Sequence, residues 1–422
     1  MSDQLTLLRK PVRSKRRREK RVLAVVGDSQ VGLWVVRSLG RYGLNVHAVC
    51  KTSNGLSAYS RYADGAWSLS CPSHSPRFAQ QIIQLARQLD VGSVMTIAES
   101  YHKALMKVRD ELEPDIHLFS PADECFEKAV DKGYMNELCL DLGVPVAKGA
   151  TLDQFLSGRN GLRYPLVLRT RNLNDRSVKR APWKAAYADG NPALEKLARD
   201  VRGAESNVVV QEYHSGVEDH VQVLMHDGEP FMVGEYVGEH HMPLAGGVTV
   251  RRVSCRHPQV IHDCIKLLKA LEWDGIAGVQ FHYDPATDDY IFLEINPRFI
   301  GGLPTVIMAG FDAPLLLWQS HFEPDNMQRT RYRLGMRTRI LGGDANWALG
   351  MIRRDPLPPD QQHVSRIRSV GSFLWNSLPW TRDDAWLVGD PKPAVVDWIN
   401  MVRRLGDKST DILGSQEKQI AT

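Results

Sequence analysis

The chain has 422 residues, of which 43% are hydrophobic and 24% are charged. This composition is typical of a folded protein of two or three domains and excludes an intrinsically disordered chain. The net charge is only +4, and no apolar stretch approaches the roughly 18 to 20 residues that span a bilayer. We therefore expect a cytoplasmic protein with no membrane partner.

The first 21 residues hold a cluster of lysines and arginines, which extends from Arg9 to Arg21. A basic run of this kind can contact nucleic acid or an acidic membrane surface. No aromatic residue is interleaved with this one, however, and the rest of the chain has no second long basic run. We therefore expect residues 1–21 to be a solvated, disordered leader and do not expect nucleic acid as a partner.

The six cysteines lie far apart in the sequence. They form no Cys-x-x-Cys pair, and no cysteine and histidine have the spacing typical of zinc sites. We expect most of them to be small core residues.

Strands and helices alternate in the first part of the chain. An apolar strand at Val22–Val26 leads through a glycine turn into a helix that ends near Arg41, and further strands are predicted at Asn45–Cys50 and Ser93–Ala98. This alternation predicts a Rossmann-like domain with a parallel sheet over residues 22–115.

The glycine turn does not fit a nicotinamide dinucleotide site. Its spacing is Gly27-x-x-x-x-Gly32, whereas that site needs Gly-x-Gly-x-x-Gly. The second strand ends in Cys50-Lys51, where an acidic residue would hold the ribose.

The pattern changes after two helices predicted at 122–130 and 131–142. Strands with hairpin turns follow, at Leu166–Thr170, Val208–Tyr213, Val221–Met225 and Phe231–Val237. We predict a second, antiparallel-rich domain over residues 116–328, and we expect residues 329–422 to be an extension that packs on the core.

The most informative segment is a strand that runs Phe292-Leu-Glu-Ile-Asn-Pro-Arg298. Side chains two apart on a strand share a face, so Glu294 and Asn296 should point the same way, with Arg298 close behind. Their oxygens suit Mg²⁺, and Gln280 on the paired strand can add a third. Polar residues within an apolar strand, followed by Pro297 and a double glycine, indicate a site rather than a solvated face.

This segment resembles the metal-binding strand of the ATP-grasp superfamily, in particular the branch with biotin carboxylase, carbamoyl phosphate synthase and predicted carboxylate-amine ligases. The resemblance covers roughly residues 22 to 330. It implies an α/β fold with α+β character, in which an ATP-grasp domain follows the Rossmann-like domain and contains a lid subdomain at about 145–215. It also implies ATP and Mg²⁺, with Mn²⁺ as an alternative ion.

The resemblance implies a role for several polar residues. Glu294 and Asn296 match the metal ligands, and Gln280 stands where the family commonly has a glutamate. Arg298 matches the arginine near the γ-phosphate and the acyl phosphate. Lys132 and Arg169 match the two basic residues that contact the phosphates of ATP, with arginine replacing the usual lysine at the second position.

Other positions follow from the same resemblance. Gln211 and Glu212 match the strand that meets adenine, and Glu218 and His220 lie where ribose-contacting residues are expected. Arg251 or Arg252 would hold a substrate carboxylate, and neighbours on a strand point oppositely, so only one should face the site. Residues 172–184 occupy the place of the loop that covers the phosphates, although they contain no glycine.

The expected function is therefore that of an ATP-dependent ligase. A carboxylate would be activated as an acyl phosphate and opened by an amine or similar nucleophile, with release of ADP and phosphate. The alternatives are a bicarbonate-activating carboxylase-like enzyme and an ATP-binding regulatory protein without turnover. Small-molecule carboxylate and amine substrates are the expected partners, with a homodimer as a further expectation.

Overall fold

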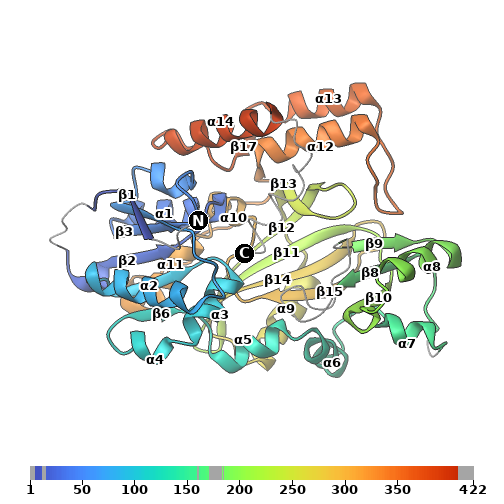
Figure 1. Cartoon of the computed structure of the whole chain (residues 1–422), viewed down its shortest axis with the longest axis horizontal. Coiled ribbons are helices and arrows are strands. Elements are labelled where there is room, and N and C mark those ends of the chain that lie inside the picture. Colours follow the sequence, from blue (N-terminus) through green and yellow to red (C-terminus); the bar gives the residue numbers. More distant parts are fainter. Residues whose placement is uncertain (1–4, 12–15, 159–160, 171–182, 184, 407–422) are drawn as a thin grey trace.

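The computed structural model describes residues 5–11, 16–158, 161–170, 183 and 185–406. A parallel sheet lies at one end of the molecule, a small antiparallel unit lies at the other, and a large sheet connects them (Figure 1). Three C-terminal helices, α12 to α14, lie along one side of this assembly (Figure 1). The α/β fold class predicted from the sequence is confirmed.

The first sheet has six strands. Their spatial order is β1 (Leu5–Arg9), β4 (Gly65–Leu69), β3 (Asn45–Cys50), β2 (Arg21–Val25), β5 (Ser93–Thr96) and β6 (His117–Phe119). All neighbours are parallel except β1, which pairs antiparallel with β4. The continuous apolar run of β2 is buried on both faces, as a central strand of a parallel sheet must be.

Two expectations about this region are wrong. Residues 5–9 are not part of a disordered leader, because β1 forms the edge of the sheet and pairs Leu5 with Leu69. The first domain also does not end at residue 115, because β6 pairs with β5 in the same parallel sheet. The signal for β1 is weak because its two-residue alternation is followed directly by the basic cluster.

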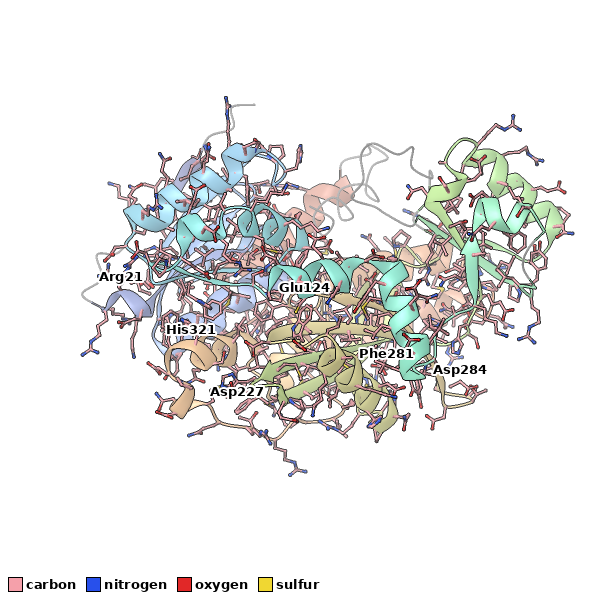
Figure 2. The ribbon with its side chains drawn as sticks, turned by 90° about the horizontal axis from the view of Figure 1, so that it is seen from below. Arg21, Glu124, Asp227, Phe281, Asp284 and His321 are labelled. Carbon is pink, nitrogen blue, oxygen red and sulfur yellow. The ribbon has the colours of Figure 1, made fainter. Side chains whose placement is uncertain are left out.

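The second half of the chain builds two further sheets. The smaller one has the order β7 (Gly149–Thr151), β10 (Val208–Glu212), β8 (Leu166–Thr170) and β9 (Ala185–Ala188). The larger one has the order β15 (Asp289–Asn296), β14 (Gly275–Asp284), β11 (Val217–His226), β12 (Glu229–Met242), β13 (Val248–Ser254), β16 (Arg337–Arg339) and β17 (Thr381–Asp383). The four strands of the smaller sheet lie within the range 145–215 expected for the lid, and Figure 2 shows this unit projecting from one end.

The helices cover these sheets. In chain order they are α1 (Gln30–Tyr42), α2 (Pro76–Gln88), α3 (Glu99–Met106), α4 (Arg109–Leu112), α5 (Asp123–Val130), α6 (Lys132–Leu142), α7 (Leu152–Leu156), α8 (Asn191–Asp200), α9 (Pro258–Ala270), α10 (Leu303–Ala309), α11 (Ala313–Phe322), α12 (Leu341–Arg353), α13 (Arg366–Trp375) and α14 (Lys392–Gly406). Within the described residues, no helix combines the length and the hydropathy needed to cross a membrane.

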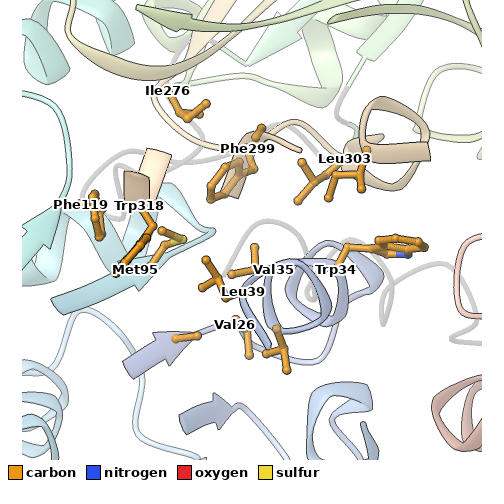
Figure 3. Packing of buried hydrophobic residues seen from close by; sticks show 14 of the residues in the cluster. Val26, Trp34, Val35, Leu39, Met95, Phe119, Ile276, Phe299, Leu303 and Trp318 are labelled. Carbon is orange, nitrogen blue, oxygen red and sulfur yellow. The ribbon is translucent and has the colours of Figure 1, made fainter. Parts of the chain in front are cut away.

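The first domain and the central sheet share one apolar core. Val26, Leu39 and Met95 of the first domain belong to the same buried cluster as Phe299 and Trp318. Figure 3 shows these side chains converging from the two domains. Because burial of apolar surface is the main stabilising term, the two domains form one packed body.

The C-terminal extension is joined to this body by strands and buried ion pairs. β16 and β17 add two strands to the central sheet, so the extension does more than pack on it. The guanidinium of Arg37 in α1 donates to Asp390 over 3.0 Å, and that of Arg252 in β13 donates to Asp384 over 2.8 Å. All four side chains are at least 98% buried.

Candidate functional site

The predicted metal strand has the expected geometry. Glu294 and Asn296 lie on β15, where the Asn296 amide donates to Glu294 Oε1 over 3.3 Å. Arg298 Nη2 donates to Asn296 Oδ1 over 2.9 Å. Gln280 on β14 is the register partner of Glu294. The structure therefore brings together all four residues that the sequence assigns to the metal and the transferred phosphoryl group.

Lys132 reaches the same cluster from another element. It is the first residue of α6, which begins there because the Asp131 carboxylate caps the helix and accepts from Gly133 N over 2.8 Å. Its Nζ lies 3.9 Å from Glu294 Oε2, and the two side chains are 45% and 41% exposed. A ligand from solvent can therefore reach both charges.

A cavity of about 520 Å³ opens beside Arg298. It lies where strands of the first domain end, at Thr96 and Ser120, and it is closed by residues of α11 and of the β11–β12 turn. Asp227 and His321, labelled in Figure 2, belong to these two walls. The carboxyl ends of parallel strands are the usual ligand-binding edge of such sheets.

Two histidines of this cavity are held neutral. Burial lowers the pKa of His102 to about 3, and the charge of Arg298 acts in the same direction. Burial likewise lowers the pKa of His117 to about 4. His102 Nδ1 lies 3.1 Å from Ser120 Oγ. The wall next to Arg298 thus offers neutral hydrogen-bonding groups, while Lys269 and the carboxylates of Asp227, Glu272 and Asp274 line other parts of the cavity.

Glu218 and His220 form part of a polar cluster on β11. Thr249 Oγ1 donates to Glu218 Oε2 over 3.1 Å, and the ring nitrogens of His220 and His241 lie 3.4 and 3.3 Å from the same oxygen. Burial alone would raise the pKa of Glu218, but the two imidazoles hold it well below its usual range. His220 also stacks on Tyr236 at 4.7 Å.

The predicted ATP-contacting residues of the smaller sheet lie on its neighbouring strands β8 and β10. Glu212 on β10 forms an ion pair with Arg163, whose Nη2 lies 3.5 Å from the carboxylate. Gln211 is the backbone register partner of Gly149 on β7 and of Val167 on β8. Arg169 on β8 lies close enough to the central sheet for its charge to act on His282, whose pKa is lowered to about 4, mainly by desolvation. The predicted phosphate-covering loop, residues 172–184, lies outside the described residues except for Trp183.

Arg251 and Arg252 point in opposite directions, as neighbours on a strand should. Arg251 donates to Glu239 over 2.9 Å and to Ser372 of α13, whereas Arg252 is fully buried against Asp384. Neither guanidinium has a described contact with the metal strand. Two bulges interrupt the pairing of β12 with β13 beside these residues. The structure therefore does not bring the predicted substrate contact Arg251 to Glu294.

Apart from Arg298, the residues that line the cavity were not predicted from the sequence. His102 and Thr96 come from different elements of the first domain, and only the sheet topology places them opposite Arg298. The available signal was their position near the carboxyl ends of predicted parallel strands.

The comparisons with known proteins identify the fold as ATP-grasp. Biotin carboxylase 1 of Bacillus subtilis is 20% identical over 312 residues, which cover 65% of this chain and 64% of that protein. The biotin carboxylase domain of the Hydrogenobacter thermophilus 2-oxoglutarate carboxylase, solved with MgADP, ADP and bicarbonate, has a TM-score of 0.57 at 16% identity and covers 75% of this chain and 73% of that one. An L-amino acid ligase from Bacillus licheniformis has a TM-score of 0.51 at 17% identity and covers 74% and 75%.

A family model matches more narrowly. Residues 204–341 match the family described as "ATP-grasp in the biosynthetic pathway with Ter operon". This segment contains Glu294, Asn296 and Arg298, so the metal strand lies within the matched domain. The resemblance to the ATP-grasp superfamily expected from the sequence is confirmed.

Proposed function

We propose that the protein is an ATP-dependent ligase that activates a carboxylate as an acyl phosphate and joins it to an amine or a similar nucleophile, releasing ADP and phosphate. The observation that supports this most directly is the position of Arg298. Its guanidinium contacts Asn296 of the metal strand and also lines the 520 Å³ cavity. A phosphoryl group and a substrate carboxylate bound on its two sides would meet at one cation.

The donor set of the metal strand fits Mg²⁺. Glu294, Asn296 and Gln280 offer a carboxylate and two amide oxygens on adjacent strands, which are the hard ligands that Mg²⁺ prefers. When bound, Mg²⁺ would offset the charge of the ATP phosphates. Gln280 contributes no charge, so a second ion would be held more weakly than by a glutamate.

The side chains around the metal strand and the cavity would have separate roles in binding and transfer. Lys132 would neutralise phosphate charge from the start of α6, and Arg298 would stabilise the charge that develops during transfer. The neutral His102 and His117 would orient the substrate by hydrogen bonds without competing with Arg298 for its carboxylate. The half-buried cluster around Glu218 would hold the side chains of that face of the central sheet in place for the nucleotide.

The test is ADP release by the full chain in a screen of carboxylate and amine pairs with Mg²⁺ and ATP. Glu294→Gln should lower the rate by at least ~100-fold, because it removes the single carboxylate of the metal site. Asp289→Asn, on the same strand but exposed, is the matched control and should leave the rate unchanged.

Three outcomes would count against the proposal. ADP formation driven by bicarbonate alone would indicate the carboxylase-like alternative. ATP binding without ADP formation for any pair would indicate a regulatory protein, and turnover that does not need ATP would exclude the whole class.

A further inference from the structure

A second group of metal-ligating side chains lies on the other face of the central sheet. It consists of Asp219, Glu235, Cys255 and His257. Asp219 lies between Glu218 and His220 in β11, so its side chain points away from the nucleotide face. That opposite face is the one packed under α9, whose Val260 and Leu267 share a buried cluster with β11 and β14.

The four ligand atoms lie within 4.8 Å of one another. His257 Nδ1 lies 2.7 Å from Asp219 Oδ2, 3.2 Å from Glu235 Oε1 and 3.9 Å from Cys255 Sγ. A tetrahedral zinc ion with bonds of about 2.1 Å separates its ligand atoms by about 3.4 Å. The observed separations bracket this value, so small side-chain rotations suffice.

One oxygen of this group lacks a hydrogen-bond donor. Asp219 and Glu235 are 0% and 1% exposed, and Asp219 Oδ1 has no hydrogen-bond partner, while Glu235 Oε1 has the His257 imidazole 3.2 Å away. Two adjacent buried carboxylates are costly unless cations compensate them. Within the group only His257 can supply positive charge, and a metal ion would compensate both carboxylates at once.

We propose that these four residues form a binding site for a divalent transition metal ion of the zinc class, separate from the Mg²⁺ of the nucleotide site. A nitrogen, a sulfur and two carboxylate oxygens are the donors that Zn²⁺ takes in tetrahedral sites. Mg²⁺ prefers oxygen ligands alone, so the imidazole and the thiol select against it. His257 is 22% exposed and provides a path for the ion from solvent.

A metal ion binds the deprotonated thiolate and a neutral imidazole, so metal binding would displace the protons on Cys255 Sγ and His257 Nδ1. The His257 ring stacks on Tyr283 at 4.0 Å, which fixes the direction of Nδ1.

The bound ion would stabilise β11 and β12 from the face opposite the nucleotide. Asp219 is flanked by Glu218 and His220, and Glu235 precedes Tyr236, on which His220 stacks. One ion would thus tie β11 and β12 to the loop that leads into α9. The role is structural and does not depend on the ligase proposal.

The experiment uses untagged full-length protein freed of metal and reconstituted anaerobically with one equivalent of Co²⁺ in excess Mg²⁺. The expected result is one bound Co²⁺ per chain, with the visible spectrum of a tetrahedral site and a thiolate-to-cobalt band in the near ultraviolet. Cys255→Ser should abolish the thiolate band, and His257→Gln should weaken Co²⁺ binding by at least ~10-fold.

Two matched controls separate this site from others. Cys125→Ser should leave the spectrum unchanged, since Cys125 is a half-buried thiol that donates to Leu271 O and a hydroxyl can replace it. Glu294→Gln should also leave it unchanged, so failure of the ligase proposal would not affect this test.

Wild-type protein alone decides the question if a variant does not fold. In the presence of saturating Mg²⁺, Zn²⁺ should displace Co²⁺ and should further raise the melting temperature of the metal-free protein. A wild-type spectrum without tetrahedral character would overturn the proposal, as would a spectrum that survives both Cys255→Ser and His257→Gln.

Discussion

The buried pair of Arg252 and Asp384 allows a prediction whose size can be worked out from the structure. Arg252→Met removes the guanidinium and leaves the Asp384 carboxylate, which is 1% exposed, without its ion-pair partner. Loss of one member of a buried pair costs about 3 to 5 kcal/mol. Protonation of Asp384 limits the electrostatic part of this cost, because a neutral carboxyl group tolerates burial.

The free-energy cost of protonating Asp384, which sets this limit, depends on pH. Protonating a carboxyl group with an unfolded-state pKa of about 3.9 costs about 4 kcal/mol at pH 7 and about 1.5 kcal/mol at pH 5. Burial already raises the pKa of Asp384, and Arg252 opposes that rise. In the variant the folded pKa rises further above the unfolded value, so the folded state binds more protons than the unfolded state. Its stability therefore increases as pH falls.

We expect Arg252→Met to lower the free energy of unfolding by about 3 to 4 kcal/mol at pH 7 and by about 2 kcal/mol less than that at pH 5. The assay is urea unfolding followed by tryptophan fluorescence at both pH values. Arg382→Met, on the exposed side of β17, is the control and should change stability by less than ~0.5 kcal/mol. The double variant Arg252→Met/Asp384→Leu should recover most of the loss. A cost below ~1 kcal/mol at pH 7, or one that is equal at both pH values, would refute the reasoning.

Further predictions concern the site and its support. Gly302→Ala should destabilise the protein by about 1 to 3 kcal/mol in thermal unfolding, because its Cβ would lie 2.3 Å from the Tyr236 ring, whereas Gly301→Ala meets nothing within 4 Å and should be neutral. Lys132→Met should raise the KM for ATP about 10- to 100-fold in steady-state kinetics, because the variant loses a hydrogen bond to a charged phosphate group. The control Lys128→Met should leave the KM for ATP unchanged. Removal of Mg²⁺ by EDTA should stop ADP formation and its readdition should restore it; persistence of turnover without a divalent ion would contradict the assignment of Glu294 and Asn296.

Local patterns predicted that Glu294 and Asn296 lie side by side, because alternation along one strand fixes which side chains share a face. Glu294 and Asn296 are two residues apart and therefore lie on one face. A register shift beside the paired residues Phe281 and Phe292, which the sequence does not reveal, places Gln280 opposite Glu294. The same rule predicts that Arg251 and Arg252 diverge. It does not predict their partners, which are Glu239 and Ser372 for Arg251 and Asp384 for Arg252.

Contacts between distant segments could not be predicted from the sequence. The cavity joins the first domain to α11 and to the turn at Asp227. The zinc-class group escapes spacing rules because Cys255 and His257 are only two apart, and their partners Asp219 and Glu235 come from two other strands. β1 was missed because its partner β4 gives no strong pattern either, and each strand is stabilised by the other.

The buried hydrogen bonds between the first domain and the C-terminal extension determine which part of the molecule can move. Trp34 and Arg37 of the first domain bind Asp384 and Asp390 near the C-terminus, so these segments and the central sheet form a single rigid frame. The four-stranded unit meets that frame through polar contacts near its rim, such as Tyr187 Oη to Ala245 O over 2.8 Å and the bond between Tyr213 and Asp360. Such contacts exchange readily with water, so we expect the four-stranded unit to move as a rigid body relative to this frame.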